Sequence, residues 1–172
     1  MARRQGGRLG VPLGVRMRGL LTAAVCVLSG ASGAAMAACS EGEVTLRGAD
    51  HGKVRFSVDL ADDPKERSQG LMFVEHMPRG AGMLFIYPEP QLLTFWMKNT
   101  LIPLDMLFID ASGTVRHIHH EAKPLDESVI NGGKDLLAVL EINGGLAKAL
   151  NLSEGDEIRH PAFGPNAAWP CD

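Results

Sequence analysis

Two acidic side chains stand inside apolar runs, where carboxylates are uncommon. Asp105 lies in LIPLDMLFI, and Glu141 lies in LLAVLEINGG. A buried carboxylate is costly unless it is paired, and Arg67 and Lys98 are the natural partners. Two carboxylates with a lysine could serve general acid–base chemistry, and the same groups could equally form a structural ion network. The sequence does not give the separation of the carboxyl groups, so both interpretations stay open.

The stretch FWMKNT, residues 95 to 100, carries a second group of useful side chains. If residues 92–98 form a strand, Trp96 and Lys98 share one face, and Asn99 and Thr100 follow directly. An indole, an ammonium and an amide together can bind an anionic or planar group. The alternative is that Trp96 completes the core while Asn99 and Thr100 satisfy the backbone of a turn.

The binding hypothesis joins these groups into one polar pocket beside Trp96, which would hold an unknown small molecule or an envelope protein. Its expected members are Glu66, Arg67, Trp96, Lys98, Asn99, Thr100, Asp105, Glu141 and Asn143. An enzyme would use Asp105 or Glu141 as its general acid or base. In the structural alternative, Asp105 caps the loop after Pro103 and Glu141 faces solvent from an edge strand.

A metal-handling role is a third hypothesis. His117 and His119 would share one face of a strand and could bind zinc or copper. A cluster of methionines could hold Cu(I), although methionine more often fills gaps in a core: Met72, Met77, Met83, Met97 and Met106. Only Met77 is expected to be exposed. The chain has no nucleophile elbow, phosphate-binding loop, H-E-x-x-H or C-x-x-C motif, and no cofactor is predicted.

The first residues resemble an export signal. Arginines precede an apolar run and the small residues Ala35-Met36-Ala37, which predicts a signal peptide over residues 1–37. A membrane-spanning helix is disfavoured because glycines interrupt the run well short of the ~20 residues that a span needs. Translation could start at Met17 instead of Met1. The expected parts after the signal are an N-terminal tail (38–50), one domain (51–164) and a C-terminal tail (165–172).

The net charge of the chain limits the kinds of molecule that it is expected to bind. The chain has 17 basic and 20 acidic residues, a net charge of −3, and the signal would take five arginines and no acid with it, leaving about −8. An acidic protein without a basic patch is a poor nucleic-acid binder. We expect an exported protein, in the periplasm or outside the cell, with no membrane span after signal removal.

Two cysteines remain after signal removal, one near each end. Because the termini of compact domains often lie close together and export exposes a protein to oxidising conditions, we predict a disulfide between Cys39 and Cys171. The rival is a lipid anchor on Cys39, for which Met36-Ala37-Ala38 is a poor signal.

The helices and strands that would position these side chains can be predicted from the spacing of apolar residues and from the proline and glycine residues that interrupt it. Asp63-Pro64 with Glu66 predicts a short helix that ends at Gly70, and a second short helix is expected at 146–150. Apolar runs and alternation predict strands at 54–60, 83–87, 92–97, 104–109, 114–119, 136–142 and up to Ile158, with a possible edge strand at 44–46 and a loop at 123–134. These elements predict an α+β domain: a compact, mainly antiparallel curled sheet or small β-barrel with two short helices.

Several motifs occur in order along the chain: Glu66-Arg67 before GLM, then GMLF, FWMKNT, IPLD, LEINGG and GD. Together they resemble the DUF192 family, also called UPF0127, over about residues 54–159. The resemblance implies a small, often exported prokaryotic domain with a mixed β fold, and it also favours the polar pocket described above. It implies no reaction, because the biochemical role of the family is not established. The histidine cluster departs from the family pattern.

Overall fold

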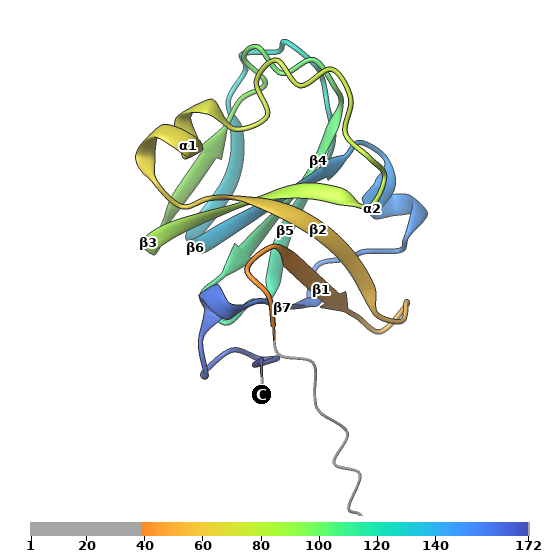
Figure 1. The fold of residues 1–172 in the computed structure, drawn as a ribbon, viewed down its shortest axis with the longest axis vertical. Coiled ribbons are helices and arrows are strands. Elements are labelled where there is room, and N and C mark those ends of the chain that lie inside the picture. The colour runs from red at the N-terminus through yellow and green to blue at the C-terminus, as the bar shows by residue number, and fades with distance from the viewer. Residues whose placement is uncertain (1–38, 172) are drawn as a thin grey trace, which may run out of the picture. The chain divides into compact units, whose positions relative to one another are not determined.

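The computed structural model describes residues 39–171, so the predicted signal peptide at 1–37 lies outside the described residues. Within that range, no helix is long and apolar enough to span a membrane. Seven strands form one curled sheet, a half-barrel with the order β5-β4-β6-β3-β2-β1-β7 (Figure 1). The strands are β1 (Glu43–Arg47), β2 (Val54–Ala61), β3 (Ala81–Phe95), β4 (Leu104–Asp110), β5 (Val115–Ala122), β6 (Ile130–Asn143) and β7 (Glu157–Arg159).

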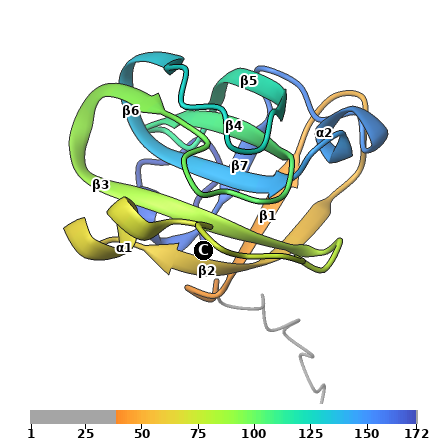
Figure 2. The ribbon, with the colours of Figure 1, turned by 90° about the horizontal axis from the view of Figure 1, so that it is seen from above.

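The helices are few and short. They are α1 (Pro64–Gln69), α2 (Leu146–Ala149) and the 3-10 turn η1 (Pro161–Phe163). The two predicted helices are therefore confirmed, and the protein is mainly β, which is compatible with the broader α+β prediction. Seen from above, the sheet curls so that α1 lies beside β3 (Figure 2).

Pairing in the sheet is antiparallel except between β2 and β3, which run parallel. The two outer strands approach each other at one end, because Thr114 and Glu157 form an isolated bridge. The Ile158 N–H also donates to the Gly113 carbonyl at 2.7 Å. The predicted curled, mainly antiparallel sheet is thus confirmed.

Three predicted boundaries differ from the structure. The strand predicted at the edge, β1, pairs on both sides, with β2 and β7, inside the segment expected to be a tail. The strands predicted at 83–87 and 92–97 are one long strand, β3, whose register against β6 shifts between Ile86 and Thr94. Pro88 and Pro90 lie in that irregular stretch, so they bend the strand without ending it. The loop predicted at 123–134 ends earlier, because β6 begins at Ile130.

The central strands are buried on both faces, so alternate residues enter two apolar clusters. Leu84, Leu107 and Leu140 belong to the cluster inside the half-barrel. Phe85 and Val139, their neighbours in sequence, belong to a second cluster on the opposite face. This arrangement explains why these strands are continuous apolar runs instead of strict alternations. It also means that a polar residue on either face sits next to a core.

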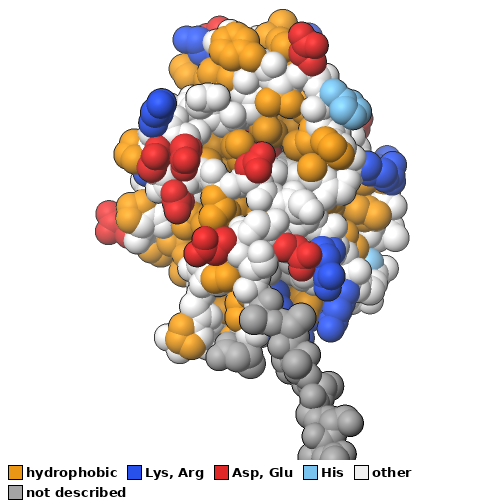
Figure 3. Space-filling view, in the orientation of Figure 1, with side chains coloured by type: hydrophobic (Ala, Val, Ile, Leu, Met, Phe, Trp, Pro, Cys, Tyr) orange, Lys and Arg blue, Asp and Glu red, His pale blue; other side chains and the backbone are white. Residues whose placement is uncertain are grey.

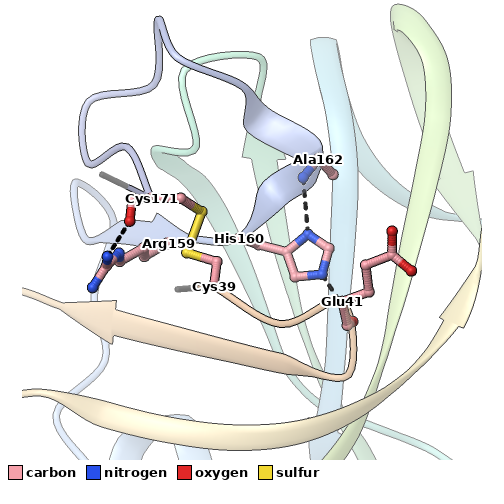
Figure 4. The surroundings of a disulfide bond; sticks show 6 residues. All are labelled: Cys39, Glu41, Arg159, His160, Ala162 and Cys171. Atoms are coloured by element: carbon pink, nitrogen blue, oxygen red, sulfur yellow. Dashed lines mark hydrogen bonds between the residues drawn. A yellow bond between two sulfur atoms is a disulfide. The ribbon is translucent and has the colours of Figure 1, made fainter. Parts of the chain in front are cut away.

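The predicted disulfide is present and ties the two ends of the described chain together. Cys39 and Cys171 are separated by 132 residues, and their Cα atoms lie 5.4 Å apart (Figure 4). Beside the bond, the Arg159 guanidinium donates to the Cys171 carbonyl. His160 Nδ1 accepts from the Ala162 N–H at 3.1 Å, and its Nε2 lies 2.9 Å from the Glu41 carbonyl. Burial lowers the pKa of His160, in keeping with a neutral ring that accepts with one nitrogen and donates with the other.

Candidate functional site

A pocket of about 100 Å³ opens between α1, both halves of β3 and the inner part of β6. Because β3 bends, its residues on either side of the bend reach the same pocket. The helix and the segment after it close the other side. The lining residues are Arg67, Ser68, Gln69, Gly70, Leu71, Met72, Phe85, Tyr87, Thr94, Phe95, Trp96, Lys98, Thr100 and Glu141.

Glu141 is the buried acid of this pocket. It is only 4% exposed, and its register partners are Met83 on β3 and Met106 on β4. Among residues 39–171, its carboxyl group makes no hydrogen bond and no ion pair. Burial raises the pKa of Glu141 to about 8, so the side chain is mostly a neutral acid near pH 7. A neutral acid can donate a hydrogen bond into the pocket, which a carboxylate cannot.

Arg67 supplies a positive charge from α1. The helix begins where the Asp63 carboxylate accepts the Glu66 N–H at 2.8 Å, with Pro64 at its first position. This cap places Arg67 on the last turn, where its guanidinium donates to the carbonyls of Asp62 and Ile86. Two carbonyl acceptors fix the group without neutralising it, so the guanidinium keeps its full charge beside the pocket.

Lys98 supplies the second positive charge, and Trp96 lies beneath it. The Lys98 Nζ atom is 5.1 Å from the centre of the indole ring, a cation–π arrangement. No carboxylate of the described chain lies within ion-pair distance of Lys98. Trp96 is 48% exposed, so the indole does not complete the core and offers a flat face at the pocket edge.

Tyr87 is a pocket residue that the sequence analysis missed. The Arg67 guanidinium lies 5.0 Å from the centre of its ring. Burial raises the pKa of the phenol, Arg67 lowers it and Glu141 raises it, so the phenol lies within electrostatic range of both. A signal was available, since Met83, Phe85 and Tyr87 alternate along β3 and the face they share follows from the strand period.

Asp105 does not belong to this pocket. It pairs with Ile142 on β6, one position away from the Met106 and Glu141 pair, so its side chain leaves the opposite face of the sheet. The Asp105 carboxylate is fully buried and accepts backbone N–H bonds from Glu121, Gly145 and Ala147 at 2.7, 3.0 and 2.7 Å. The predicted pairing of the two acids in one site is therefore wrong, and Asp105 holds the start of α2 in place.

Three other residues predicted to line the pocket instead make hydrogen bonds that hold backbone segments in place. Glu66 caps α1. Asn99 has a positive φ of 54°, and its carbonyl accepts the Phe73 N–H at 2.8 Å. The Asn143 amide donates to the carbonyls of Met77 and Pro78, each at 3.1 Å. The structure thus gathers Arg67, Trp96, Lys98, Thr100 and Glu141 in the pocket and places the other four predicted members outside its lining.

The metal hypothesis finds little geometric support. Across residues 39–171, no group of three or more His, Cys, Asp or Glu side chains could hold a metal ion. His117 Nδ1 lies 3.1 Å from a Glu154 carboxylate oxygen, and its ring stacks on Phe108. Met77, predicted to be exposed, is buried instead, because it belongs to the second apolar cluster.

The family model DUF192, described as "Uncharacterized ACR, COG1430", matches residues 45–160. A crystal structure from Sinorhizobium meliloti 1021, described as a candidate transcription regulator, is 41% identical, with a TM-score of 0.67, and the match covers 70% of this chain and 94% of that one. A protein of unknown function from Novosphingobium aromaticivorans DSM 12444 is 40% identical, with a TM-score of 0.66 and coverage of 67% and 82%. No curated protein matches.

Proposed function

This chain belongs to the DUF192 family, and we propose that it is an exported binding domain that holds a small anionic group in the pocket beside Trp96. The regulator description of one similar structure is not carried over, because the chain has a net negative charge, which disfavours binding to a phosphate backbone. The proposal concerns binding, and the ligand is defined by its chemistry.

The buried acid at the pocket is the observation that carries the proposal. Buried polar groups are normally hydrogen-bonded to the protein or to water. Glu141 has no such partner within the described residues, yet it borders a space about 100 Å³ in volume. A strongly shifted ionisable group that borders a pocket is a typical sign of a functional site.

The surrounding charges select an anion. Arg67 and Lys98 both line the pocket and would attract a carboxylate or a similar group. The neutral Glu141 acid would then donate its proton in a hydrogen bond to the same ligand. Trp96 and Tyr87 provide flat apolar area, as is common in small-molecule sites. The small volume restricts the buried part of the ligand to a few heavy atoms.

Export is supported by two independent features. The Cys39–Cys171 bond is of a kind that persists in oxidising compartments. The pattern of residues 1–37 is that of a secretory signal. A periplasmic or extracellular location fits both features.

A catalytic role for Glu141 is the second candidate. A carboxyl with a pKa near 8 can exchange a proton at neutral pH, as a general acid requires. Asp105 is no candidate for such a role, because its oxygens are occupied by three backbone N–H donors. A catalyst would convert its ligand, whereas a binding domain would release it unchanged.

The test is titration calorimetry of the purified protein with acetate, glycolate, glycine and inorganic phosphate at pH 6.5 and pH 9. We expect saturable binding of at least one anion at pH 6.5 and weaker binding at pH 9, where the ionised Glu141 repels it. Lys98→Met should weaken binding about tenfold, while Lys134→Met, on an exposed residue outside the pocket, should not. Absence of any saturable anion, or equal binding by the Lys98 variant, would refute the proposal. If NMR detected chemical conversion of the bound anion, this result would favour the catalytic alternative.

A further inference from the structure

Large apolar side chains are exposed together at the end of the molecule where three loops meet. The most exposed are Val129 (72%), Phe73 (68%) and Leu125 (60%), and Trp96 and Leu101 are also exposed. We call these five residues the loop surface. Figure 1 places the loops that carry them at the top of the sheet, and Figure 3 shows hydrophobic side chains on that end.

Backbone hydrogen bonds join the three loops into one unit. The Phe73 N–H donates to the Asn99 carbonyl at 2.8 Å, and the Leu125 N–H donates to the Thr100 carbonyl at 3.1 Å. The Met97 N–H donates to the Asp126 carbonyl at 2.8 Å. The exposed side chains therefore stand on a connected framework, not on three independent loops.

Two members of the loop surface hold an unfavourable backbone conformation. Phe73 has a φ of 65° and Leu125 a φ of 62°, in the left-handed region that bulky residues rarely adopt. Such residues cost of order 1–3 kcal/mol and tend to cluster at ligand clamps and active sites. Glycine or asparagine would suit these positions better. An exposed phenylalanine and leucine there gain nothing from burial within the described fold.

The loop surface is continuous with the pocket. Trp96 belongs to both, and Met72 and Thr100, which line the pocket, are chain neighbours of Phe73 and Leu101. A bridge between Met72 and Thr100 ties the two loops at the pocket wall. Any molecule that covers the loop surface therefore lies next to Arg67 and Lys98.

We propose that the loop surface docks a protein partner that lays an apolar segment across it and inserts an acidic side chain into the pocket. The inference rests on the proposed anion site, because Lys98 and Arg67 select the acidic side chain. Apolar area rimmed by polar groups is typical of protein–protein contacts. The inserted carboxylate acts as the central anchor, and the apolar contacts around it exclude water.

Two other occupants fit the surface less well. An anionic membrane would need a net positive surface, whereas Glu75, Asp126 and Glu127 in these loops offset the charges of Arg79, Lys98 and Lys123. A fatty acid would need an apolar tunnel for its chain, whereas the pocket holds about 100 Å³ and exposes mostly polar atoms. A protein segment needs only the open surface and one small polar site.

The test uses a synthetic pool of acetylated and amidated pentapeptides with glutamate fixed at the centre and the four flanking positions randomised. The purified protein selects binders from the pool, and mass spectrometry identifies them. We expect enrichment of leucine, isoleucine and phenylalanine at the flanks. Replacement of the central glutamate by glutamine in the best peptide should weaken binding about tenfold, and a free C-terminal carboxylate without the glutamate should not restore it.

The variant for this test is Phe73→Asn with Leu125→Asn. Asparagine tolerates a positive φ, so the double variant should unfold at the same or a higher temperature while it binds the selected peptide about tenfold more weakly. Leu92→Asn is the matched control, because Leu92 is also more than half exposed, on β3, but lies outside the three loops. It should keep full peptide affinity.

The outcomes separate the two proposals. Enrichment of polar flanks, no enrichment at all, or full affinity in the double variant would overturn the loop-surface proposal, and anion binding in calorimetry would still stand. The anion site itself would be overturned by two results together: the unmodified protein binds no anion in calorimetry, and Lys98→Met leaves peptide binding unchanged. Binding to phosphatidylglycerol vesicles, or self-association in sedimentation, that disappears in the double variant would assign the surface to a membrane or to a second copy and would also overturn the proposal.

Discussion

Asp105 and Glu141 lie on adjacent strands, one position out of register with each other, so their carboxyl groups leave the sheet on opposite faces. On one face, Asp105 accepts three backbone N–H bonds. On the other, Glu141 borders the pocket without a partner in the described chain and is largely protonated. Two buried acids that look alike in the sequence therefore have different surroundings, one held by backbone donors and one facing the pocket.

Substitution of the two acids should separate these roles. Asp105→Asn turns an amide group toward backbone donors and should cost about 3 kcal/mol of unfolding free energy. Glu141→Gln replaces a neutral acid by a neutral amide of the same shape and should cost about 1 kcal/mol or less near pH 7. Urea unfolding measures both. Equal losses in the two variants would contradict the assignment.

The stability of the protein should depend on the protonation of Glu141. Its pKa of about 8 in the folded state lies above the ordinary value of 4.5, so the folded protein holds one extra proton between these limits. The contribution to stability is fully present below pH 4.5, is lost by up to about 1.4 kcal/mol per pH unit as pH rises, and is gone above pH 8. The free-energy difference between wild type and Glu141→Gln should follow this slope. A difference that stays constant from pH 5 to pH 8 would rule out the shifted pKa.

Loss of the disulfide should destabilise the fold strongly. Cys39 and Cys171 close a loop across a separation of 132 residues, which is worth about 4–5 kcal/mol in the chain-entropy account. The double variant Cys39→Ser with Cys171→Ser should therefore unfold at a much lower urea concentration than the oxidised protein. Reduced wild type is the matched control and should behave like the variant. Identical midpoints for oxidised and reduced protein would show that the bond contributes little.

Even the smallest side chain at Gly132 is expected to destabilise the fold. A Cβ atom there would lie 2.0 Å from the Phe108 ring, and Phe108 is fully buried and packs edge-on against Phe95. Gly132→Ala should cost about 1–3 kcal/mol through overpacking. Gly80→Ala, where a Cβ meets nothing within 4 Å, should change the unfolding free energy by less than about 0.5 kcal/mol. Similar stability of the two variants would argue against the close contact at Gly132.

Much of the fold could be predicted because local signals and tertiary structure agree. Asp63-Pro64 with Glu66 starts α1 in the structure as the sequence indicates. The hairpin of β4 and β5 forms across its glycine turn. The bend of β3 could not be predicted, because Pro88 and Pro90 normally end a strand. Only the pairing with β6 carries the strand past them.

The site could be predicted only in part. Arg67, Trp96, Lys98, Thr100 and Glu141 converge as expected. Asp105 does not, because the face of a strand residue depends on register, and a shift of one position moves it across the sheet. The face of Tyr87 follows from the alternation along β3, but its place in the pocket was missed, because the bend of β3 that brings it to Thr94 and Phe95 is not visible in a single sequence.

The disulfide has a practical consequence for attachment. Cys39 and Cys171 hold both ends of the described chain at the bottom of Figure 1, far from the loops at its top. A fusion, a label or a solid support joined through either end would leave the loop surface and the pocket pointing outward and unobstructed. The same protein could thus serve directly as the immobilised bait in sensor measurements, with the loop surface free.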